Sequence, residues 1–332
     1  MTTWDPAPFR DQVQQVLDAF LDERGAELAP LGPDAGRLIN EARTAVRGGK
    51  RFRAAFGHWG YRAIRPSVAD ELALARACAS LEVLHASALV HDDYMDASDT
   101  RRGRPATHRA FEAEHRAAGW RGDPEQYGAA AAILLGDLLL GWAEDMLRRS
   151  GFAPDEVAPG IALFEACRNE VIAGQFLDVS VQARGRADVD TAMTVLRYKS
   201  AKYSIERPLH TGEAFQLRDD VLGVFGDPAA TGKPAGDDLV EGKRTVLVAL
   251  ALDAAPAAAA ARLDGALGTP LGAADVDELR GIIEDSGARA QVEDVIGQLA
   301  EHAVESLRAA DVDDAARVVL TELAAAATQR TV

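Results

Sequence analysis

Hydrophobic residues recur at helical spacing along most of the chain. Apolar side chains lie three or four residues apart over residues 9–21 and again over residues 74–92, as in amphipathic helices. Alternating patterns typical of strands are hard to find, and alanine, the strongest helix former, is abundant throughout. Glycine and proline gather between these stripes, where helices end. The pattern therefore predicts an all-α fold.

Length and composition predict a single folded domain. The chain has 332 residues, of which 48% are hydrophobic, so it can bury a sizeable core. No shift in composition and no short-period repeat divides it. We expect one domain over residues 1–332. Its motif-bearing core is expected at residues 40–250, followed by alanine-rich, chemically quiet helices at residues 251–332.

The charge and the apolar runs exclude several classes of protein. The net charge is −16, from 36 basic and 52 acidic side chains, which argues against a nucleic-acid partner. The longest apolar runs, residues 127–135 and 245–252, are shorter than the ~20 residues of a membrane span. The first residues have no signal-peptide pattern. Cys78 and Cys167 lie among apolar residues and are expected to stay reduced. We expect a cytoplasmic protein without a membrane span.

The segment LVHDDYMDASDTRRG, residues 89–103, carries the first cluster of acidic residues. It follows a helical stripe directly, so Asp92 and Asp96 are predicted to lie one turn apart on one helix face. Stacked like charges destabilise a helix unless a cation offsets them, and Mg²⁺ prefers such oxygen ligands. Arg101 and Arg102 could hold phosphate oxygens that the metal leaves exposed.

Two other interpretations of this segment stay open from its residues alone. A solvated acidic helix end is common in so acidic a chain. An EF-hand fits poorly, since Ala97 and Gly103 stand where its loop needs Gly and Glu. A second acidic pair, Asp219 and Asp220 in FQLRDDVLGVFGD, favours the metal site. Two carboxylate clusters on facing helices would bracket metal ions with a diphosphate between them.

Cationic residues form a further candidate site. The motif GGKRFR, residues 48–53, opens a predicted helix, where backbone N–H groups and three cations could bind an anion. An ordinary basic helix start is the alternative. Lys199 and Lys233 are single lysines, and most such lysines lie on solvated surface.

Together with GQFLD (residues 174–178), YKSAKY (198–203) and TGKPAGDD (231–238), these motifs resemble the trans-polyprenyl diphosphate synthases. This type I isoprenoid synthase family includes farnesyl and geranylgeranyl diphosphate synthases. The resemblance covers residues 48–243 and implies a helical bundle around a central active-site cavity. It implies a Mg²⁺-dependent prenyltransferase that condenses isopentenyl diphosphate with dimethylallyl, geranyl or farnesyl diphosphate. Three bound Mg²⁺ ions and a homodimer are also implied.

The resemblance implies a role for each matching residue. Metal ligands are expected at Asp92, Asp93, Asp96, Asp219 and Asp220. The allylic diphosphate is expected at Arg101, Lys199 and Lys233, and the diphosphate of isopentenyl diphosphate at Lys50, Arg53, His85 and Arg102. Lys199 also belongs to the expected catalytic set, with Ser200, Gln175 and Gln216, and these last three are expected to stabilise a developing carbocation. A histidine on an apolar helix face is usually a core residue, but His85 lies two turns before Asp92 on the same face, where the family places a substrate ligand.

Small residues before the first acidic cluster bear on product length. Ser87 and Ala88 lie one turn before Asp92, where family members that stop at fifteen carbons often carry a bulky aromatic residue. Val83 and Leu84, another turn away, could form part of a floor. We expect geranylgeranyl diphosphate, with twenty carbons, as the product. Farnesyl and longer-chain products stay open, as do the preferred primer and the downstream pathway.

Two features depart from the family pattern. Gly223 stands where many members carry a third Asp in the second cluster, so that one metal ligand is lost or supplied by water. The stretch from Lys199 to Gln216 is shorter than the family's two helices require. It predicts either a real deletion or a missing segment at the seam His210–Thr211.

Two other classes of function compete with this interpretation. A terpene cyclase on the same fold would not need GGKRFR, and it would carry an Asn/Ser/Glu metal triad where this chain has DDVLGVFGD. A non-catalytic subunit of a heteromeric synthase usually loses an acidic cluster, whereas this chain keeps both.

Overall fold

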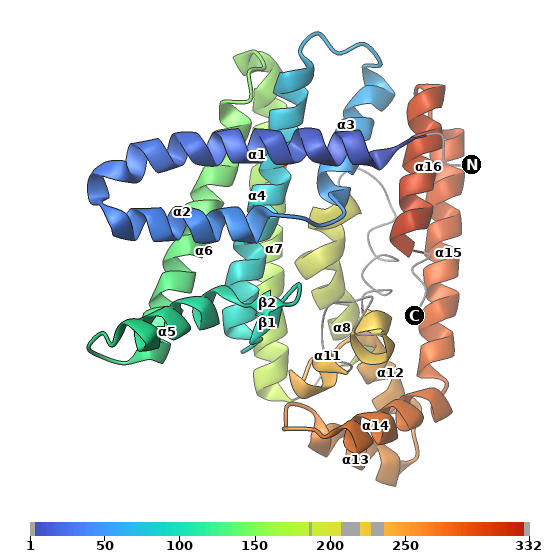
Figure 1. Cartoon of the computed structure of the whole chain (residues 1–332). Helices are drawn as coiled ribbons and strands as arrows, with labels where there is room; N and C mark the ends of the chain where they lie inside the picture. The colour runs from blue at the N-terminus through green and yellow to red at the C-terminus, as the bar shows by residue number, and fades with distance from the viewer. Residues whose placement is uncertain (1–3, 186–187, 207–219, 227–235, 329–332) are drawn as a thin grey trace. The chain divides into compact units, whose positions relative to one another are not determined.

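The computed structural model describes residues 4–185, 188–206, 220–226 and 236–328. The described residues are mostly helical (Figure 1), and their only strands are β1 (Thr100–Arg101) and β2 (Arg104–Pro105), which pair as a short antiparallel hairpin. The prediction of an all-α fold is confirmed. The short stretch predicted to lack residues falls mostly outside the described ranges, and so does its seam at His210–Thr211.

The chain divides into two compact units. The first comprises residues 1–165 and 311–320, and the second comprises residues 166–310 and 321–332. The division falls inside two helices, α7 (Pro154–Arg184) and α16 (Asp314–Thr328), which contribute to both units. The expectation of a single domain over the whole chain stays a prediction.

Most helices of the first unit begin at an aspartate or a proline. Asp5, Asp70 and Asp123 each accept a hydrogen bond from a backbone N–H of the first turn, at 2.9–3.0 Å. Such caps satisfy donors that would otherwise lack an intrahelical partner. The elements of this unit, besides the hairpin and its parts of α7 and α16, are α1 (Pro6–Leu28), η1 (Ala29–Leu31), α2 (Pro33–Val46), α3 (Phe52–Ile64), α4 (Glu71–Met95), α5 (Thr107–Ala118) and α6 (Pro124–Arg148).

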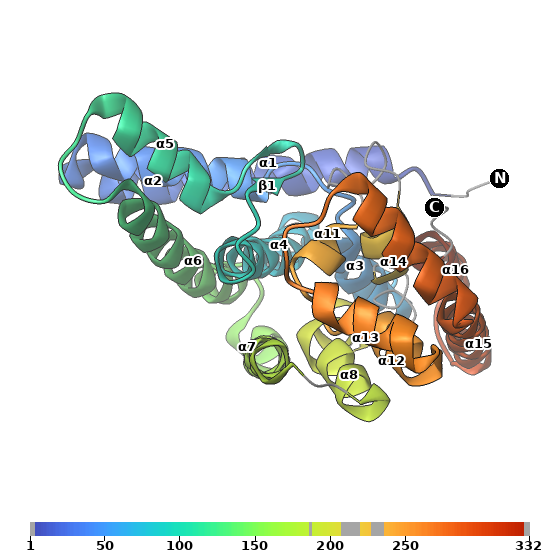
Figure 2. The same cartoon turned by 90° about the horizontal axis from the view of Figure 1, so that it is seen from below.

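Helix α4 is the centre of the first unit. It packs against α1, α3 and α6, and Figure 2 shows it end-on between them. Buried residues lie on most of its circumference, from Ala73 to Asp93. Among the described residues, α4 alone is long and apolar enough to cross a membrane, and 67% of its most apolar window is buried inside the protein. That degree of burial is typical of a core helix.

Glycines on α6 allow its neighbours to approach closely. A Cβ at Gly128 would lie 2.2 Å from the carbonyl oxygen of His108 on α5, and one at Gly136 would lie 2.2 Å from the His91 ring of α4. The hydroxyl of Ser87 donates to the Gly136 carbonyl at 2.7 Å. These contacts fix the register of α4 against α6 and therefore the position of the acidic end of α4.

The second unit has its own apolar core, built from short helices. In chain order they are the remainder of α7, α8 (Val189–Leu196), the π-helical turns η2 (Arg197–Glu206), a helical segment at residues 220–225, α11 (Asp237–Val240), α12 (Val246–Ala254), α13 (Ala257–Ala266), α14 (Ala273–Asp285), α15 (Ala288–Ala309) and the end of α16. Fully buried residues from six of them meet in one cluster: Val221, Val224, Leu239, Leu247, Leu263, Leu279 and Val292.

A buried ion pair anchors the loop before α3 to α4. The guanidinium of Arg51 donates to Glu82 at 3.1 Å, to the Gln14 side chain at 2.7 Å and to the Val46 carbonyl at 2.6 Å. The other carboxylate oxygen of Glu82 accepts from the backbone N–H of Ala54 at 3.2 Å. Arg51 adopts φ +58°, a strained backbone region that these four bonds stabilise.

We predict that Arg51→Met lowers the free energy of unfolding by roughly 3–5 kcal/mol, because it leaves the Glu82 carboxylate buried without its cation. Arg51→Met with Glu82→Gln should recover much of that loss, since the neutral amide keeps the acceptor for Ala54. Urea unfolding measures both. Arg148→Met, which removes exposed ion pairs, should cost under about 1 kcal/mol. Equal effects of Arg51→Met and Arg148→Met would contradict the prediction.

Candidate active site

The first acidic cluster lies at the C-terminal end of α4. The backbone N–H of Asp96 donates to the Asp92 carbonyl at 2.8 Å, so the two carboxylates are one helical turn apart, as predicted. Ala97 then adopts φ +54° and the chain leaves the helix. Oδ1 of Asp92 and both carboxylate oxygens of Asp96 are shielded from water. Anionic oxygens in such surroundings favour a nearby cation.

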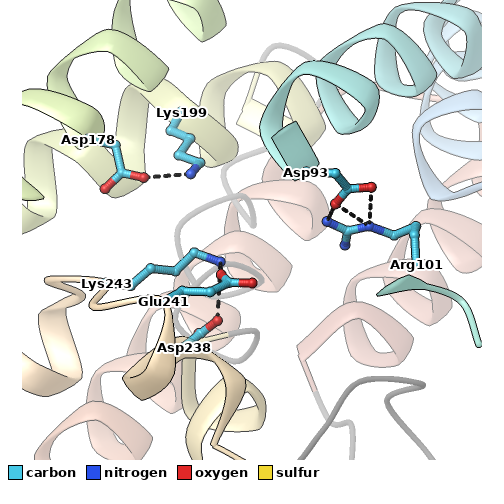
Figure 3. A network of polar contacts seen from close by, with 7 residues as sticks. All are labelled: Asp93, Arg101, Asp178, Lys199, Asp238, Glu241 and Lys243. Carbon is cyan, nitrogen blue, oxygen red and sulfur yellow. Dashed lines mark hydrogen bonds and ion pairs between the residues drawn. The ribbon is translucent and has the colours of Figure 1, made fainter. Parts of the chain in front are cut away.

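Asp93 lies against Arg101 and not beside the other two carboxylates. Arg101 Nε is 2.9 Å and 3.2 Å from the two carboxylate oxygens of Asp93, and its Nη2 also contacts Oδ1 (Figure 3). The β1–β2 hairpin turns Arg101 back onto α4. Asp93 is 4% exposed, so this ion pair is shielded from water on the carboxylate side. Asp93 therefore holds Arg101 in place, and its role as a metal ligand stays a prediction.

The donor set of this cluster fits Mg²⁺. Within the described residues, no three His, Cys, Asp or Glu side chains converge closely enough to hold a metal ion by themselves. Mg²⁺ in proteins is usually bound by one or two carboxylates, with waters and substrate phosphates completing its octahedron. Asp92 and Asp96 are the residues of the first unit that would hold it.

Next to the acidic cluster, arginines from two segments surround His85. Burial lowers the pKa of His85 well below 6.5, and the charges of Arg53, Arg102, Arg101 and Arg51 lower it further. The pKa of Arg102 is itself lowered, first by burial and then by its cationic neighbours. Four guanidinium groups around a neutral imidazole repel one another, and this repulsion is relieved when an anion binds.

The GGKRFR loop positions Arg102 in this cluster. Nη1 of Arg102 donates to the Arg47 carbonyl at 2.5 Å, and Nη2 of Arg102 lies 3.1 Å from the position that a Cβ of Gly49 would occupy. Gly49 has φ +87°, so glycine serves both the turn and the close approach. The structure thus brings together Arg53, His85 and Arg102, three of the four residues predicted to bind isopentenyl diphosphate. Lys50, the fourth, lies in the same loop, with its Nζ 5.9 Å from the centre of the Phe52 ring.

In the second unit, α7 carries Gln175 and Asp178 beside η2. A Cβ at Gly174 would lie 2.3 Å from the backbone nitrogen of Lys199, so glycine is required where the two backbones touch. The Nζ of Lys199 is 2.6 Å from Oδ2 of Asp178 (Figure 3). Ser200 follows Lys199 on η2. Three residues of the predicted catalytic set therefore lie on two adjoining segments of this unit.

A second lysine of this unit contacts two carboxylates. The Nζ of Lys243 is 3.2 Å from Oδ1 of Asp238 and also contacts Glu241, as Figure 3 shows. Asp220 is the first described residue of the helical segment at residues 220–225 and is 6% exposed. Gln216, Asp219 and Lys233, which were predicted as site residues, lie outside the described ranges.

Asp178, Asp238, Glu241 and Lys243 were not predicted as functional residues. Asp178 and Asp238 stand inside the quoted motifs GQFLD and TGKPAGDD, so their presence there was a signal. No sequence feature distinguished Lys243 from a lysine on the protein surface. Cys78 and Cys167 are buried and form no disulfide, and burial raises the pKa of the Cys78 thiol to about 12. That both stay reduced remains a prediction.

The arginine cluster predicts a proton linkage at His85. In the free protein its imidazole should stay neutral below pH 6.5, whereas the unfolded chain becomes protonated there, so this group's contribution to stability falls as the pH falls below about 6.5. Inorganic pyrophosphate should raise the pKa of His85 by offsetting the four guanidinium charges. Histidine NMR titration with and without pyrophosphate measures this. His58, whose pKa is lowered to about 4 outside the cluster, is the reference; equal responses would contradict the prediction.

We predict that Gly174→Ala displaces η2 from α7, because the new methyl group would overlap the backbone of Tyr198 and Lys199. The free energy of unfolding should fall by about 1–3 kcal/mol. Gly160→Ala on the same helix meets no atom within 4 Å and should be neutral or slightly stabilising. Thermal unfolding compares them, and equal melting temperatures for both variants would refute the close contact.

Comparison with known proteins adds independent evidence. The pattern of the Polyprenyl synthetase family matches residues 37–212 and 209–285, in two stretches that meet near the predicted seam. The geranylfarnesyl diphosphate synthase of Aeropyrum pernix is 31% identical over 265 residues, 73% of this chain and 77% of its own length. The geranylgeranyl diphosphate synthase of Mycobacterium tuberculosis is 32% identical over 257 residues, 69% of this chain and 67% of its own.

A solved structure agrees over the whole chain. The geranylgeranyl pyrophosphate synthase of Corynebacterium glutamicum, crystallised with isoprenyl diphosphate and magnesium, has a TM-score of 0.95 and 39% identity. The match covers 99% of this chain and 100% of that one. With the acidic cluster of α4 and the arginines around His85, these similarities confirm the expected resemblance: the chain belongs to the polyprenyl synthetase family.

Proposed function

We propose that this chain is a geranylgeranyl diphosphate synthase, a short-chain trans-prenyltransferase that condenses isopentenyl diphosphate with an allylic diphosphate. The observation that carries the proposal is the group of guanidiniums around a neutral His85, next to the carboxylates of Asp92 and Asp96. Cationic side chains bind diphosphate groups, and carboxylates bind the Mg²⁺ that accompanies a diphosphate. Both features therefore favour a diphosphate substrate.

The family resemblance implies a role for charged residues in each unit. In the first unit, Lys50, Arg53, His85 and Arg102 bind the diphosphate of isopentenyl diphosphate, and Arg101, held by Asp93, binds the allylic diphosphate. In the second unit, Asp178 contacts Lys199, and the family resemblance assigns Lys199 and Lys233 to the allylic diphosphate. The metal ligands are Asp92 and Asp96 with Asp93 in support, and Asp219 with Asp220.

The chemistry is an ionisation followed by attack of an alkene. Mg²⁺, when bound, supplies Lewis-acid stabilisation of the leaving diphosphate. Arg101 and Lys199 stabilise the charge that develops as the allylic C–O bond breaks. Stabilisation of the allylic cation is assigned to Gln175, Ser200 and Gln216. The double bond of isopentenyl diphosphate then forms the new C–C bond, and a proton passes to the released diphosphate. Arg53, His85 and Arg102 keep the attacking molecule oriented.

Further properties belong to the same proposal. Three Mg²⁺ ions, a homodimeric assembly and a cytoplasmic location follow from the family and not from contacts in this chain. A terpene cyclase would have no use for the arginines around His85, because it binds one diphosphate. A non-catalytic subunit would have no need of the shielded oxygens of Asp92 and Asp96.

The direct test is incubation of the full chain with Mg²⁺, isopentenyl diphosphate and each primer in turn: dimethylallyl, geranyl and farnesyl diphosphate. We expect a dominant twenty-carbon product. A fifteen- or thirty-carbon product would support the prenyltransferase reaction but refute the assignment of a twenty-carbon product. No elongation by folded protein would refute the catalytic proposal.

Product length should depend on Ala88, one turn before Asp92 and only partly buried. Ala88→Phe is expected to shorten the main product to fifteen carbons, because the ring fills the space next to the cluster. Ser87→Ala is the matched control. Its hydroxyl faces the Gly136 carbonyl of α6, so removing it should leave the product at twenty carbons. Chromatography that separates products by carbon number measures the product length of both variants. An unchanged product from Ala88→Phe would contradict the assignment of Ala88 to the product-length pocket.

A further inference from the structure

Two segments of the second unit, α7 and η2, meet along one face of α7. Glu170, Gly174 and Asp178 are four residues apart, so they lie on one side of that helix and span about 12 Å. Asp178 is 2.6 Å from the Nζ of Lys199, and Gly174 leaves no room for a Cβ against the backbone of Lys199. The third residue, Glu170, also contacts η2 and has no part in the proposed reaction.

Glu170 binds a second lysine of η2. The Nζ of Lys202 is 3.2 Å from Oε1 of Glu170 and 4.4 Å from the centre of the Tyr198 ring. Only 19% of the Lys202 side chain and 20% of the Glu170 side chain are exposed. A lysine gives up hydration and conformational freedom to lie in such a place. The pair therefore differs from the exposed ion pairs that contribute little to a fold.

Lys202 is also unusual in the sequence. The chain has 36 basic side chains, and only five of them are lysines. Lys50, Lys199 and Lys233 have a proposed role in diphosphate binding, and Lys243 contacts two carboxylates. Lys202 is the remaining one. Since the chain uses arginine for its other cations, Lys202 does not belong to a general background of surface lysines.

The winding of η2 makes this segment depend on contacts with its neighbours. Residues 197–206 continue α8 as a π-helical stretch, in which hydrogen bonds join residues five apart. Such winding is rare beyond a single turn, so packing against other segments must hold it. Lys199 and Ser200 lie inside this stretch. Asp178 contacts its beginning, and Glu170 contacts the position three residues after Lys199.

We infer that Lys202 is a positioning residue for Lys199 and Ser200. Its contact with Glu170 holds η2 at one point along α7, and the contact with Asp178 holds it at another. A segment held at two points cannot rotate about either of them. Without Lys202 a single pivot is left, and the ammonium and hydroxyl groups lose their orientation. The inference rests on the proposed function, because it assumes that these two groups act on the allylic substrate.

Steady-state kinetics of the full chain with Mg²⁺ and each allylic primer test this role. Lys202→Met and Glu170→Gln should lower kcat about 10- to 100-fold, since a misplacement of about 1 Å can have that effect. The KM for isopentenyl diphosphate should stay within about twofold, because its proposed ligands lie in the first unit. Lys202→Arg keeps the cation and should retain kcat within about threefold. Asn169→Ala, at the exposed neighbour of Glu170, should match the unaltered protein.

A double variant and a measurement without turnover complete the test. If Glu170 acts through Lys202, then Lys202→Met with Glu170→Gln should be no slower than the slower single variant. Hydrogen exchange followed by mass spectrometry should be faster at residues 197–202 in Lys202→Met and unchanged in α12. Glu170→Gln keeps the shape of the side chain and carries the same test if Lys202→Met fails to fold.

Unchanged kcat in folded Lys202→Met and Glu170→Gln would overturn the inference and leave the proposed function intact. Independent, additive losses in the double variant would do the same. A loss of kcat with unchanged exchange at residues 197–202 would also overturn it, because Lys202 would then act without holding η2. If the unaltered protein elongates no primer, the proposed function fails first and the inference falls with it.

Discussion

Repulsion between like charges gathered around His85 is the constraint on which the first unit depends. Arg51, Arg53, Arg101 and Arg102 all lower the pKa of His85, so they stand close enough to oppose another positive charge. The fold tolerates this because Arg51 pairs with the buried Glu82 and Arg101 with the buried Asp93. In the proposed function, binding of a diphosphate would relieve the remaining repulsion, and the energy released would contribute to binding.

The second unit follows the same logic with lysines. Lys199 contacts Asp178, and Lys243 contacts Asp238 and Glu241, so each ammonium group is held by a carboxylate of its own unit. A flexible lysine loses conformational entropy when it binds a phosphate, and a carboxylate that already fixes its position reduces that loss. Glycine at residues 174 and 223 is part of this arrangement, because each leaves room for one partner of a pair.

Much of the fold and part of the site could be predicted from the sequence. The helical fold and the turn that joins Asp92 to Asp96 follow from local spacing and composition. The convergence of GGKRFR with Arg102 was predicted through the family resemblance. The structural role of Arg51 was not predicted. The sequence does not distinguish the three cations of the GGKRFR loop, and only the packing shows that Arg51 is the one paired with Glu82. The two-residue hairpin was also missed, since strands this short have no alternating pattern to detect.

The sequence by itself determined which segments carry charge and which turn into helix, because these depend on neighbours within a few residues. It also registered Gly223 as a departure, without a reason for it. Only the tertiary structure decided which charges meet. Asp238 is fifteen positions from Gly223, and Asp178 is 21 from Lys199, so their contacts arise from how the helices of the second unit pack. A contact across such a separation depends on that packing, which no local pattern of residues encodes.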